Sequence, residues 1–175
     1  MSRSALFLDR DGTLIVDVGY PRDPDGVTLV EGAADALRAL QRDFALVIIS
    51  NQSGIGRGII RDYEAAAVHE RVIERFQAAG VTFAGAYYCP HAPQDHCRCR
   101  KPAPGLIEDA VRELDLDLSR SFMIGDKPSD LDAGRSAGCR YLVRFGSYEE
   151  DGDASAQCAE WAEVRAFIAS TEEPG

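Results

Sequence analysis

Short apolar stretches alternate with amphipathic stretches along most of this chain. The apolar stretches are continuous and end at polar or turn-forming residues, which is typical of strands that are buried on both faces. The predicted strands are Ala5–Leu8, Phe44–Ile49, Phe83–Tyr88, Phe122–Ile124 and Tyr141–Val143. Between these strands, apolar residues recur at helical spacing. The predicted helices are Ala33–Leu40, Asp62–Ala79, Pro104–Leu114 and Ser129–Ser136, with a further amphipathic stretch over Ala159–Ile168.

The alternation of strands and helices predicts an α/β fold of three layers, in which a parallel sheet carries helices on both faces. Ligands of such sheets bind outside the carboxyl ends of the strands, so the polar residues that follow each strand are the candidates for a site. A length of 175 residues is typical of one compact domain, and we expect residues 1–175 to form one. The acidic tail from Ser147 to Gly175 is expected to contain a last packed helix and then to fray.

The charge balance argues against some classes of partner. Lys and Arg number 19 and Asp and Glu 29, and the net charge of −10 disfavours broad contact with nucleic acid or an anionic membrane. The longest apolar runs are far shorter than the ~20 residues of a membrane span, and the first residues lack the apolar region of a secretory signal. We therefore expect a cytoplasmic protein without nucleic-acid or membrane partners. Cys139 and Cys158 are expected to be reduced thiols, and His69 an ordinary surface or core histidine.

A pair of carboxylates follows the first predicted strand, in the sequence Asp9-Arg10-Asp11-Gly12-Thr13. Gly12 permits a tight bend, so both carboxylates can face one cleft at the end of the strand. Like charges this close repel each other unless a cation lies between them or one of them is protonated. Mg²⁺ takes carboxylate oxygens and keeps waters that a phosphate can replace. A turn that merely favours Asp is the alternative, but the whole pattern is rare enough to favour a magnesium site.

A second acidic motif follows the fourth predicted strand, in the sequence Gly125-Asp126-Lys127-Pro128-Ser129-Asp130. Asp126 is placed to complete the ligand shell of the metal. Asp130 either orients that site or caps the helix that follows. The motif is weak evidence by itself, because a helix cap would explain half of it. Beside the first acidic motif it becomes strong evidence for one shared site.

Two further polar segments, Ser50–Gly54 and Arg100–Pro102, follow the second and third predicted strands. A hydroxyl and the backbone N–H groups of a helix start, opposite an ammonium, can bind a phosphate. Each segment could equally be a solvated turn if taken alone. The glycines of Ser53–Gly58 are similar to those of a dinucleotide-binding loop, but the last glycine comes one residue early and no suitable acidic partner follows. We therefore exclude a dinucleotide site.

Cysteine and histidine residues cluster in the loop that follows the third predicted strand. The segments Cys89-Pro90-His91 and Cys97-Arg98-Cys99 supply three thiolates and an imidazole, a set that suits tetrahedral Zn²⁺. Four protein ligands leave no open position, so we expect a structural zinc site that staples residues 89–99. His96 competes for the fourth position, and the symmetry of the Cys-x-His and Cys-x-Cys halves favours His91.

The four polar motifs, in this order and each at a strand end, resemble those of the haloacid dehalogenase (HAD) superfamily of phosphatases. This resemblance implies a sheet ordered 3-2-1-4-5, with Asp9 as the nucleophile that forms an aspartyl phosphate. It implies that Asp11 is the general acid and base. Ser50 and Lys101 would hold the phosphoryl group. Asp126 would bind Mg²⁺ together with Asp9 and the backbone carbonyl of Asp11.

The zinc motif narrows the resemblance, which covers residues 5–146, to a small branch without a cap domain. This branch includes D-glycero-D-manno-heptose 1,7-bisphosphate 7-phosphatases and histidinol-phosphate phosphatases. The similarity is greater to the heptose branch, and it implies an enzyme that hydrolyses the C7 phosphate of the heptose bisphosphate, with Arg100 in substrate recognition. Separately, we expect the protein to be a monomer. The residues that would contact this phosphorylated sugar are Asp17, Val18, Gly19, Tyr20, Ser50, Asn51, Gln52, Ser53, Arg100, Lys101 and Lys127.

Two alternatives stay open at this point. The five residues between His91 and Cys97 are the spacing of the histidinol-phosphate enzymes, whereas Arg100 and Lys127 suit a second phosphate better than the ammonium and imidazole of histidinol phosphate. A phosphorelay receiver domain, which is not an enzyme, shares the parallel sheet, the acidic magnesium pocket, a hydroxyl and a lysine. Its phosphorylated Asp follows the third strand, where this chain has Cys89.

Overall fold

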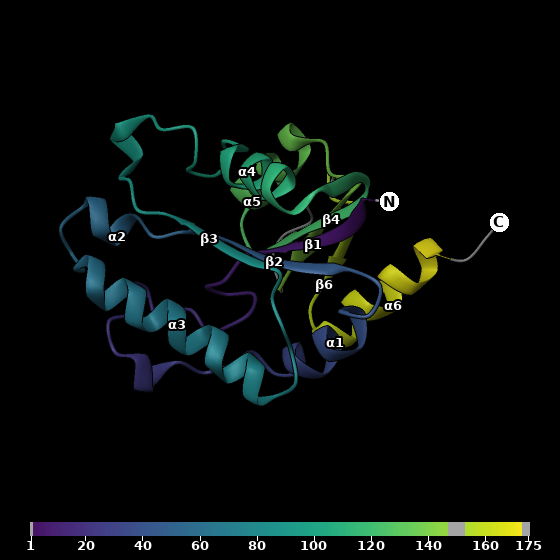
Figure 1. The fold of residues 1–175 in the computed structure, drawn as a ribbon, viewed down its shortest axis with the longest axis horizontal. Helices are drawn as coiled ribbons and strands as arrows, with labels where there is room; N and C mark the ends of the chain where they lie inside the picture. Colours follow the sequence, from purple (N-terminus) through teal and green to yellow (C-terminus); the bar gives the residue numbers. More distant parts are fainter. Residues whose placement is uncertain (1, 147–152, 173–175) are drawn as a thin grey trace.

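One parallel sheet forms the centre of the molecule (Figure 1). The computed structural model describes residues 2–146 and 153–172, and the six strands found there have the order β3-β2-β1-β4-β5-β6. They are β1 (Arg3–Leu8), β2 (Ala45–Asn51), β3 (Gly85–Cys89), β4 (Leu116–Gly125), β5 (Tyr141–Phe145) and β6 (Ala156–Cys158). The order of the first five strands confirms the one that the resemblance implied, and β6 extends the sheet beyond β5.

Helices cover both faces of the sheet, as the sequence predicted (Figure 1). One face packs on α4 (Gly105–Leu114) and α5 (Pro128–Ala137), and the other on α1 (Ala33–Leu40), α3 (Asp62–Ala78) and α6 (Trp161–Glu172). The short helix α2 (Ser53–Gly56) and the 3-10 turns η1 (Pro24–Gly26) and η2 (Pro93–Asp95) lie in the connections. Along β1, Leu6 and Leu8 enter one core while Ala5 and Phe7 enter the other, which explains why the strand is apolar throughout. None of the described helices is both long and apolar enough to cross a membrane.

Element boundaries differ from the predicted ones where packing outside the sheet supplies the apolar contacts. Phe83 was expected to begin the third strand, but it precedes β3 and packs edge-on against Phe76 of α3, with ring centroids 5.3 Å apart. β4 begins at Leu116, well before Phe122, because its first residues pair with the start of β1 across an irregularity in register. Neither β6 nor α2 was predicted, since three or four residues carry too little periodicity to be recognised.

The C-terminal helix is tied to the loop that follows β1. The predicted last helix is present, but it begins at Trp161 and ends at Glu172. Trp161 is only 1% exposed, and its indole Nε1 donates a hydrogen bond to the carbonyl oxygen of Thr13 at 3.1 Å. α6 therefore supports the same loop that carries the first acidic motif. The expected fraying and the first part of the acidic tail fall on residues 173–175 and 147–152, which lie outside the described residues.

The carboxyl ends of the central strands meet at one edge of the sheet. The backbone N–H of Asp9 donates to the carbonyl oxygen of Ile124 at 2.9 Å, so β1 and β4 end side by side. On the other flank β1 pairs in register with β2, and Asn51 at the end of β2 pairs with Cys89 at the end of β3. The polar motifs of the sequence are thereby brought to one edge of the sheet, in the position that parallel α/β folds use for ligands.

One histidine of α3 lies in the core near this edge. His69 is 8% exposed and its ring packs against that of Tyr88, with centroids 5.0 Å apart. Burial, assisted by the positive charge of Arg10, lowers the pKa of His69 to about 4, and the smaller effect of Asp11 opposes this. A histidine that is neutral when folded and has a pKa near 6.5 when unfolded binds more protons in the unfolded state between these two values.

We predict that His69 makes the protein lose stability on acidification. The neutral imidazole contributes up to about 3 kcal/mol to the free energy of unfolding. This contribution is complete above pH 6.5, falls as the pH drops from 6.5 towards 4, and is lost below about pH 4. Urea unfolding of the wild type and of His69→Gln between pH 7.5 and pH 5 measures this, and the variant should show the smaller pH dependence. His96→Asn, at an exposed position, is the control and should keep the wild-type dependence. The same dependence of the free energy of unfolding on pH in the wild type and in His69→Gln would contradict the prediction.

Candidate active site

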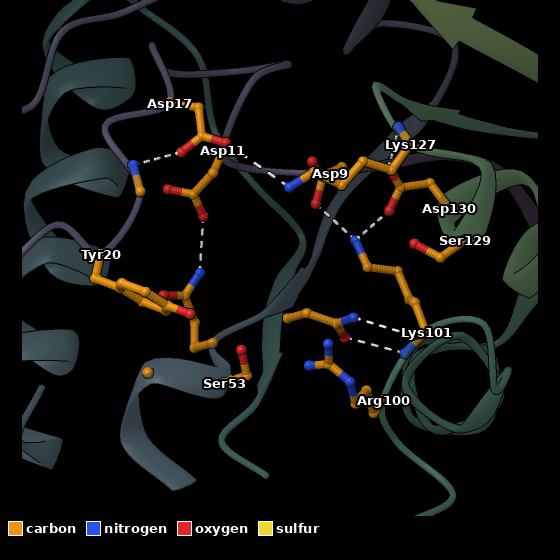
Figure 2. Close-up of a pocket in the computed structure, with 14 residues that line it drawn as sticks. Asp9, Asp11, Asp17, Tyr20, Ser53, Arg100, Lys101, Lys127, Ser129 and Asp130 are labelled. Carbon is orange, nitrogen blue, oxygen red and sulfur yellow. Dashed lines mark hydrogen bonds and ion pairs between the residues drawn. The ribbon is translucent and has the colours of Figure 1, made fainter. Parts of the chain in front are cut away.

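A cavity of about 330 Å³ opens at the carboxyl edge of the sheet (Figure 2). Its walls come from the loop after β1, the end of β2 with α2, the segment after the cysteine loop, and the start of α5. The lining residues are Asp9, Asp11, Asp17, Gly19, Tyr20, Asn51, Gln52, Ser53, Gly54, Arg100, Lys101, Lys127, Ser129 and Asp130. The structure thus brings together, at one cavity, residues from all four motifs that the sequence singled out.

Three of the expected site residues do not line this cavity. Ser50 is buried, and its hydroxyl accepts a hydrogen bond from Nε2 of Gln52 at 2.7 Å. Val18 is 65% exposed and faces a separate apolar groove next to the cavity, which Val16 also lines. Asp126 is buried behind Gly12. In this arrangement Gln52, rather than Ser50, presents its side chain to the cavity.

Three buried carboxylates form the floor of the site. Asp9, Asp126 and Asp130 each offer an oxygen atom, and these three atoms lie within 4.8 Å of one another. Burial raises the pKa of Asp9 well above its ordinary value, and the negative charges of Asp130 and Asp126 raise it further. Burial likewise raises the pKa of Asp126. A cluster of this kind is stable in the ionised form only with positive charge at its centre.

Lys101 supplies one positive charge to this cluster. Its ammonium group lies 2.6 Å from Asp9 Oδ1 and 2.7 Å from Asp130 Oδ1 (Figure 2). It also lies 2.7 Å from the carbonyl oxygen of Ile49. Although burial favours the neutral amine, Asp130 and Asp9 raise the pKa of Lys101 above its ordinary value. Each of the three N–H groups of the ammonium therefore has an acceptor, and Lys101 is held as a cation next to Asp9.

Asn51 fixes the backbone of Lys101. Its side-chain Nδ2 donates to the carbonyl oxygen of Lys101 and its Oδ1 accepts from the backbone N–H of Lys101, both at 3.0 Å. Both polar atoms of the Asn51 amide are thus engaged within the protein. Asn51 was expected to contact substrate. It lines the cavity, but its hydrogen bonds hold the segment that follows the cysteine loop.

One carboxylate oxygen of the cluster is left without a hydrogen bond. Oδ1 of Asp126 is buried and accepts no hydrogen bond from the residues that the structure describes. The other oxygen lies against Gly12, which has φ +88°, and a Cβ at that glycine would come within 2.3 Å of Asp126 Oδ2. Glycine is therefore required here both by the backbone conformation and by the close approach of Asp126. An orphaned carboxylate oxygen beside Asp9 is a donor set that fits a hard divalent cation.

Asp11 forms the wall of the cavity above this floor. Its carboxylate accepts hydrogen bonds from Nε and Nη2 of the buried Arg10, at 3.0 and 3.2 Å, and from Nε2 of Gln52 at 2.8 Å. At the rim, Asp17 from the loop after β1 lies 3.7 Å from the ammonium of Lys127 (Figure 2). The side chain of Lys127 is 57% exposed, so this rim ion pair is accessible to a charged ligand.

The cysteine and histidine residues of the loop form a second cluster. Ligand atoms of Cys89, His91, Cys97 and Cys99 lie within 4.8 Å of one another, and among the described residues His96 has no place in this group. The three sulfur atoms are 3.0 to 3.5 Å apart, too far for a disulfide and close to the ~3.8 Å edge of a tetrahedron of thiolates around Zn²⁺. This donor set fits zinc.

The loop that carries the cysteine cluster packs closely against two glycines of neighbouring helices, one of which belongs to α2 at the cavity. A Cβ at Gly56 of α2 would lie 2.5 Å from the backbone nitrogen of Ala92, and a Cβ at Gly105 would lie 2.3 Å from the carbonyl oxygen of Arg98. The loop therefore packs against α2 and the start of α4. Because Cys99 is separated from Lys101 by one residue, the cluster determines where Arg100 and Lys101 emerge. Of the glycines in Ser53–Gly58, Gly56 serves this packing, whereas Gly54 lies against Tyr20 and Ile60.

Sequence reasoning did not assign a place in the cavity to Ser129 and Gly54, and it left two roles for Asp130. Asp130 caps α5, since its Oδ2 accepts from the backbone N–H of Lys127 at 2.9 Å. Its other oxygen pairs with Lys101, which the sequence gave no means to foresee. For Ser129 a signal existed, because it lies within the second acidic motif at the start of a predicted helix. For Gly54 there was none beyond its neighbours.

Comparisons with known proteins agree with this geometry. Residues 98–166 match a family described as HAD-hydrolase-like. The chain is 40% identical over 163 residues to the D-glycero-β-D-manno-heptose-1,7-bisphosphate 7-phosphatase of Yersinia pestis, covering 87% of each chain. It is 42% identical over 152 residues to the phosphatase of the same name from Photorhabdus laumondii, covering 81% of each.

A solved structure of a heptose bisphosphate phosphatase has the same fold. The D,D-heptose 1,7-bisphosphate phosphatase of B. bronchiseptica, complexed with magnesium and phosphate, superposes with a TM-score of 0.85 at 28% identity, covering 97% of this chain and 99% of that one. Identity of about 40% over most of both sequences, with the same fold, establishes common descent. The chain belongs to the HAD superfamily of phosphatases, in the branch that contains these heptose bisphosphate phosphatases.

Proposed function

We propose that this protein hydrolyses the C7 phosphate of D-glycero-D-manno-heptose 1,7-bisphosphate and releases the heptose 1-phosphate. The observation that carries the proposal is the identity of about 40%, over most of the chain, to phosphatases of that name. Arg100 and Lys127 line the same cavity as Lys101 and supply more positive charge than one phosphoryl group requires. A substrate with a second phosphate that is bound but not cleaved accounts for these extra cations.

In the proposed mechanism, the carboxylate of Asp9 attacks phosphorus in line and displaces the sugar oxygen, which leaves an aspartyl phosphate on Asp9. Asp11 donates a proton to the departing oxygen and then accepts a proton from the water that cleaves the aspartyl phosphate. Lys101, held by Asn51 and Asp130, orients the Asp9 carboxylate and stabilises the negative charge of the phosphoryl oxygens. Gln52 and Ser53 line the cavity as further donors, and Ser50 acts through Gln52.

Magnesium is the proposed catalytic cofactor. Asp9, Asp126 and the backbone carbonyl of Asp11 would hold it, and the unpartnered Oδ1 of Asp126 supports this assignment. When bound, the ion neutralises charge on the phosphoryl oxygens and keeps Asp9 ionised. The B. bronchiseptica phosphatase, whose fold this chain shares, is complexed with magnesium and phosphate.

Zinc is the proposed structural cofactor, held by Cys89, His91, Cys97 and Cys99. With four protein ligands it has no catalytic position, so its effect is to hold the loop that presents Arg100 and Lys101. We further propose that the protein acts as a monomer in the cytoplasm. None of the five cysteines forms a disulfide among the described residues, which suits a reducing compartment and a zinc-thiolate site.

The substrate is tested by measuring kcat/KM for both anomers of the heptose bisphosphate and for histidinol phosphate under the same conditions with Mg²⁺. We expect a heptose bisphosphate to exceed histidinol phosphate by more than tenfold, because the latter brings an ammonium and an imidazole to a site with Arg100 and Lys127. Lys127→Ala should raise KM for the bisphosphate with a small effect on kcat, since its side chain lies at the rim. Preference for histidinol phosphate would overturn the substrate and leave the phosphatase chemistry intact.

We predict that Asp9→Asn lowers kcat by about a thousandfold or more, because the amide cannot act as the nucleophile. The fold should be retained, since the substitution removes a desolvated charge and Lys101 keeps Asp130 as a partner. Phosphate release measures the first effect and thermal unfolding the second. Asp35→Asn, an exposed carboxylate paired with Arg38, is the control and should retain full activity. Turnover by Asp9→Asn at a tenth of the wild-type rate would exclude Asp9 as nucleophile.

We predict one zinc ion per chain, measured by elemental analysis of the purified protein. Cys97→Ala should lose the metal, lower the melting temperature and lower kcat with Mg²⁺ in excess, because the loop no longer fixes Arg100 and Lys101. Cys139→Ala, a buried cysteine outside the cluster, should retain zinc. A Cys97→Ala protein with full zinc content would show that these four residues do not form the site.

A further inference from the structure

A buried guanidinium supports the wall of the cavity without lining it. Arg10 lies between Asp9 and Asp11 in the chain, and its side chain is 1% exposed. Its Nε donates to Oδ2 of Asp11 at 3.0 Å and its Nη2 to Oδ1 at 3.2 Å. The two parallel bonds form a fork that fixes both the position and the plane of the Asp11 carboxylate.

Stability does not account for this arrangement. The remaining nitrogen of the guanidinium, Nη1, is buried and has no hydrogen-bond partner in the described part of the chain. Asp11 is the ion-pair partner of Arg10 among the described residues, and the nearby imidazole of His69 is buried and carries an unpartnered Nδ1. A buried ion pair with an unsatisfied donor is commonly no more stable than apolar side chains of similar volume. The retained charge therefore points to a role in the site.

A second group holds the same carboxylate from the cavity side. Nε2 of Gln52 donates to Oδ2 of Asp11 at 2.8 Å and also to the hydroxyl of Ser50 at 2.7 Å. Asp11 thus receives three hydrogen bonds, two from behind the wall and one from within the cavity. Only Gln52 among these donors is within reach of a substrate, since Gln52 lines the cavity and Arg10 does not.

We infer that Arg10 is a positioning residue for the proton transfers of Asp11. Its fork holds the Asp11 carboxylate against the cavity wall, where it meets the leaving oxygen and then the attacking water. The inference rests on the proposed role of Asp11 as general acid and base. It implies that two donors in fixed geometry are required, so that a single ammonium at this position does not replace the guanidinium.

The test compares substrates whose leaving groups differ in their need for a proton. With p-nitrophenyl phosphate the leaving phenolate departs without general acid, whereas the alkoxide of a sugar phosphate does not. For Arg10→Lys and Arg10→Met we expect kcat on heptose bisphosphate to fall by about 10²-fold or more, with KM nearly unchanged. The first turnover of p-nitrophenyl phosphate should fall less than tenfold. Because hydrolysis of the aspartyl phosphate still needs Asp11, a burst of p-nitrophenolate equal to the enzyme concentration should appear.

The controls separate the failure of this inference from that of the proposed mechanism. Arg38→Lys, at an exposed arginine paired with Asp35, should behave as wild type. Asp11→Asn should show the same leaving-group dependence as the Arg10 variants, and its full activity on the sugar phosphate would overturn the role of Asp11 itself. Suppose that Asp11→Asn behaves as expected. If Arg10→Lys then loses activity equally on both substrates, or keeps full activity on both, Arg10 is not a positioning residue. Arg10→Lys keeps the buried charge, so the comparison stands even if Arg10→Met does not fold.

Discussion

The site depends on the balance of charge around one buried ammonium group. Three carboxylates lie within a few ångströms of each other at the end of the sheet, in surroundings that disfavour charge. Lys101 reaches two of them and a backbone carbonyl, and it compensates only part of their negative charge. The uncompensated part, centred on Asp126, makes the floor of the cavity a donor set that fits a divalent cation. Removal of Lys101 would leave a cluster of carboxylates that repel one another and would deprive Asp9 of its ion-pair partner.

Much of the remaining structure serves to put Lys101 in this position. It comes from an irregular segment, so no strand or long helix orients it directly. The cysteine cluster closes the preceding loop, Asn51 clamps the backbone of Lys101 from the end of β2, and Ile49 accepts from its ammonium. Under the proposed function, the cysteine cluster affects catalysis only through the position of Lys101. The cysteine loop and the carboxylate floor are linked because Cys99 and Lys101 are nearly adjacent in the chain.

The meeting of the four motifs at one edge of the sheet and the grouping of Cys89, His91, Cys97 and Cys99 were predictable from the sequence. Both depend on local pattern: apolar runs that end in Asp, a glycine that allows a bend, and thiolates at ligand spacing. The strand order was implied by the resemblance to HAD phosphatases. The resemblance to HAD phosphatases rests on these same patterns, and the comparisons confirm it. The ends of β3 and α6, and the existence of β6, were not predictable, since packing partners distant in the chain decide them.

By itself, the sequence determined which chemical groups this protein brings to the edge of its sheet, because the carboxyl end of every parallel strand lies there. Only the tertiary structure decided how those groups pair: Asp130 with Lys101, Asn51 with the Lys101 backbone, and Gln52 with both Ser50 and Asp11. Except for Gln52 and Ser50, which are two positions apart, these pairs join residues tens of positions apart in the chain. Such hydrogen bonds depend on donor and acceptor positions that are set to within a few tenths of an ångström, which no sequence spacing encodes.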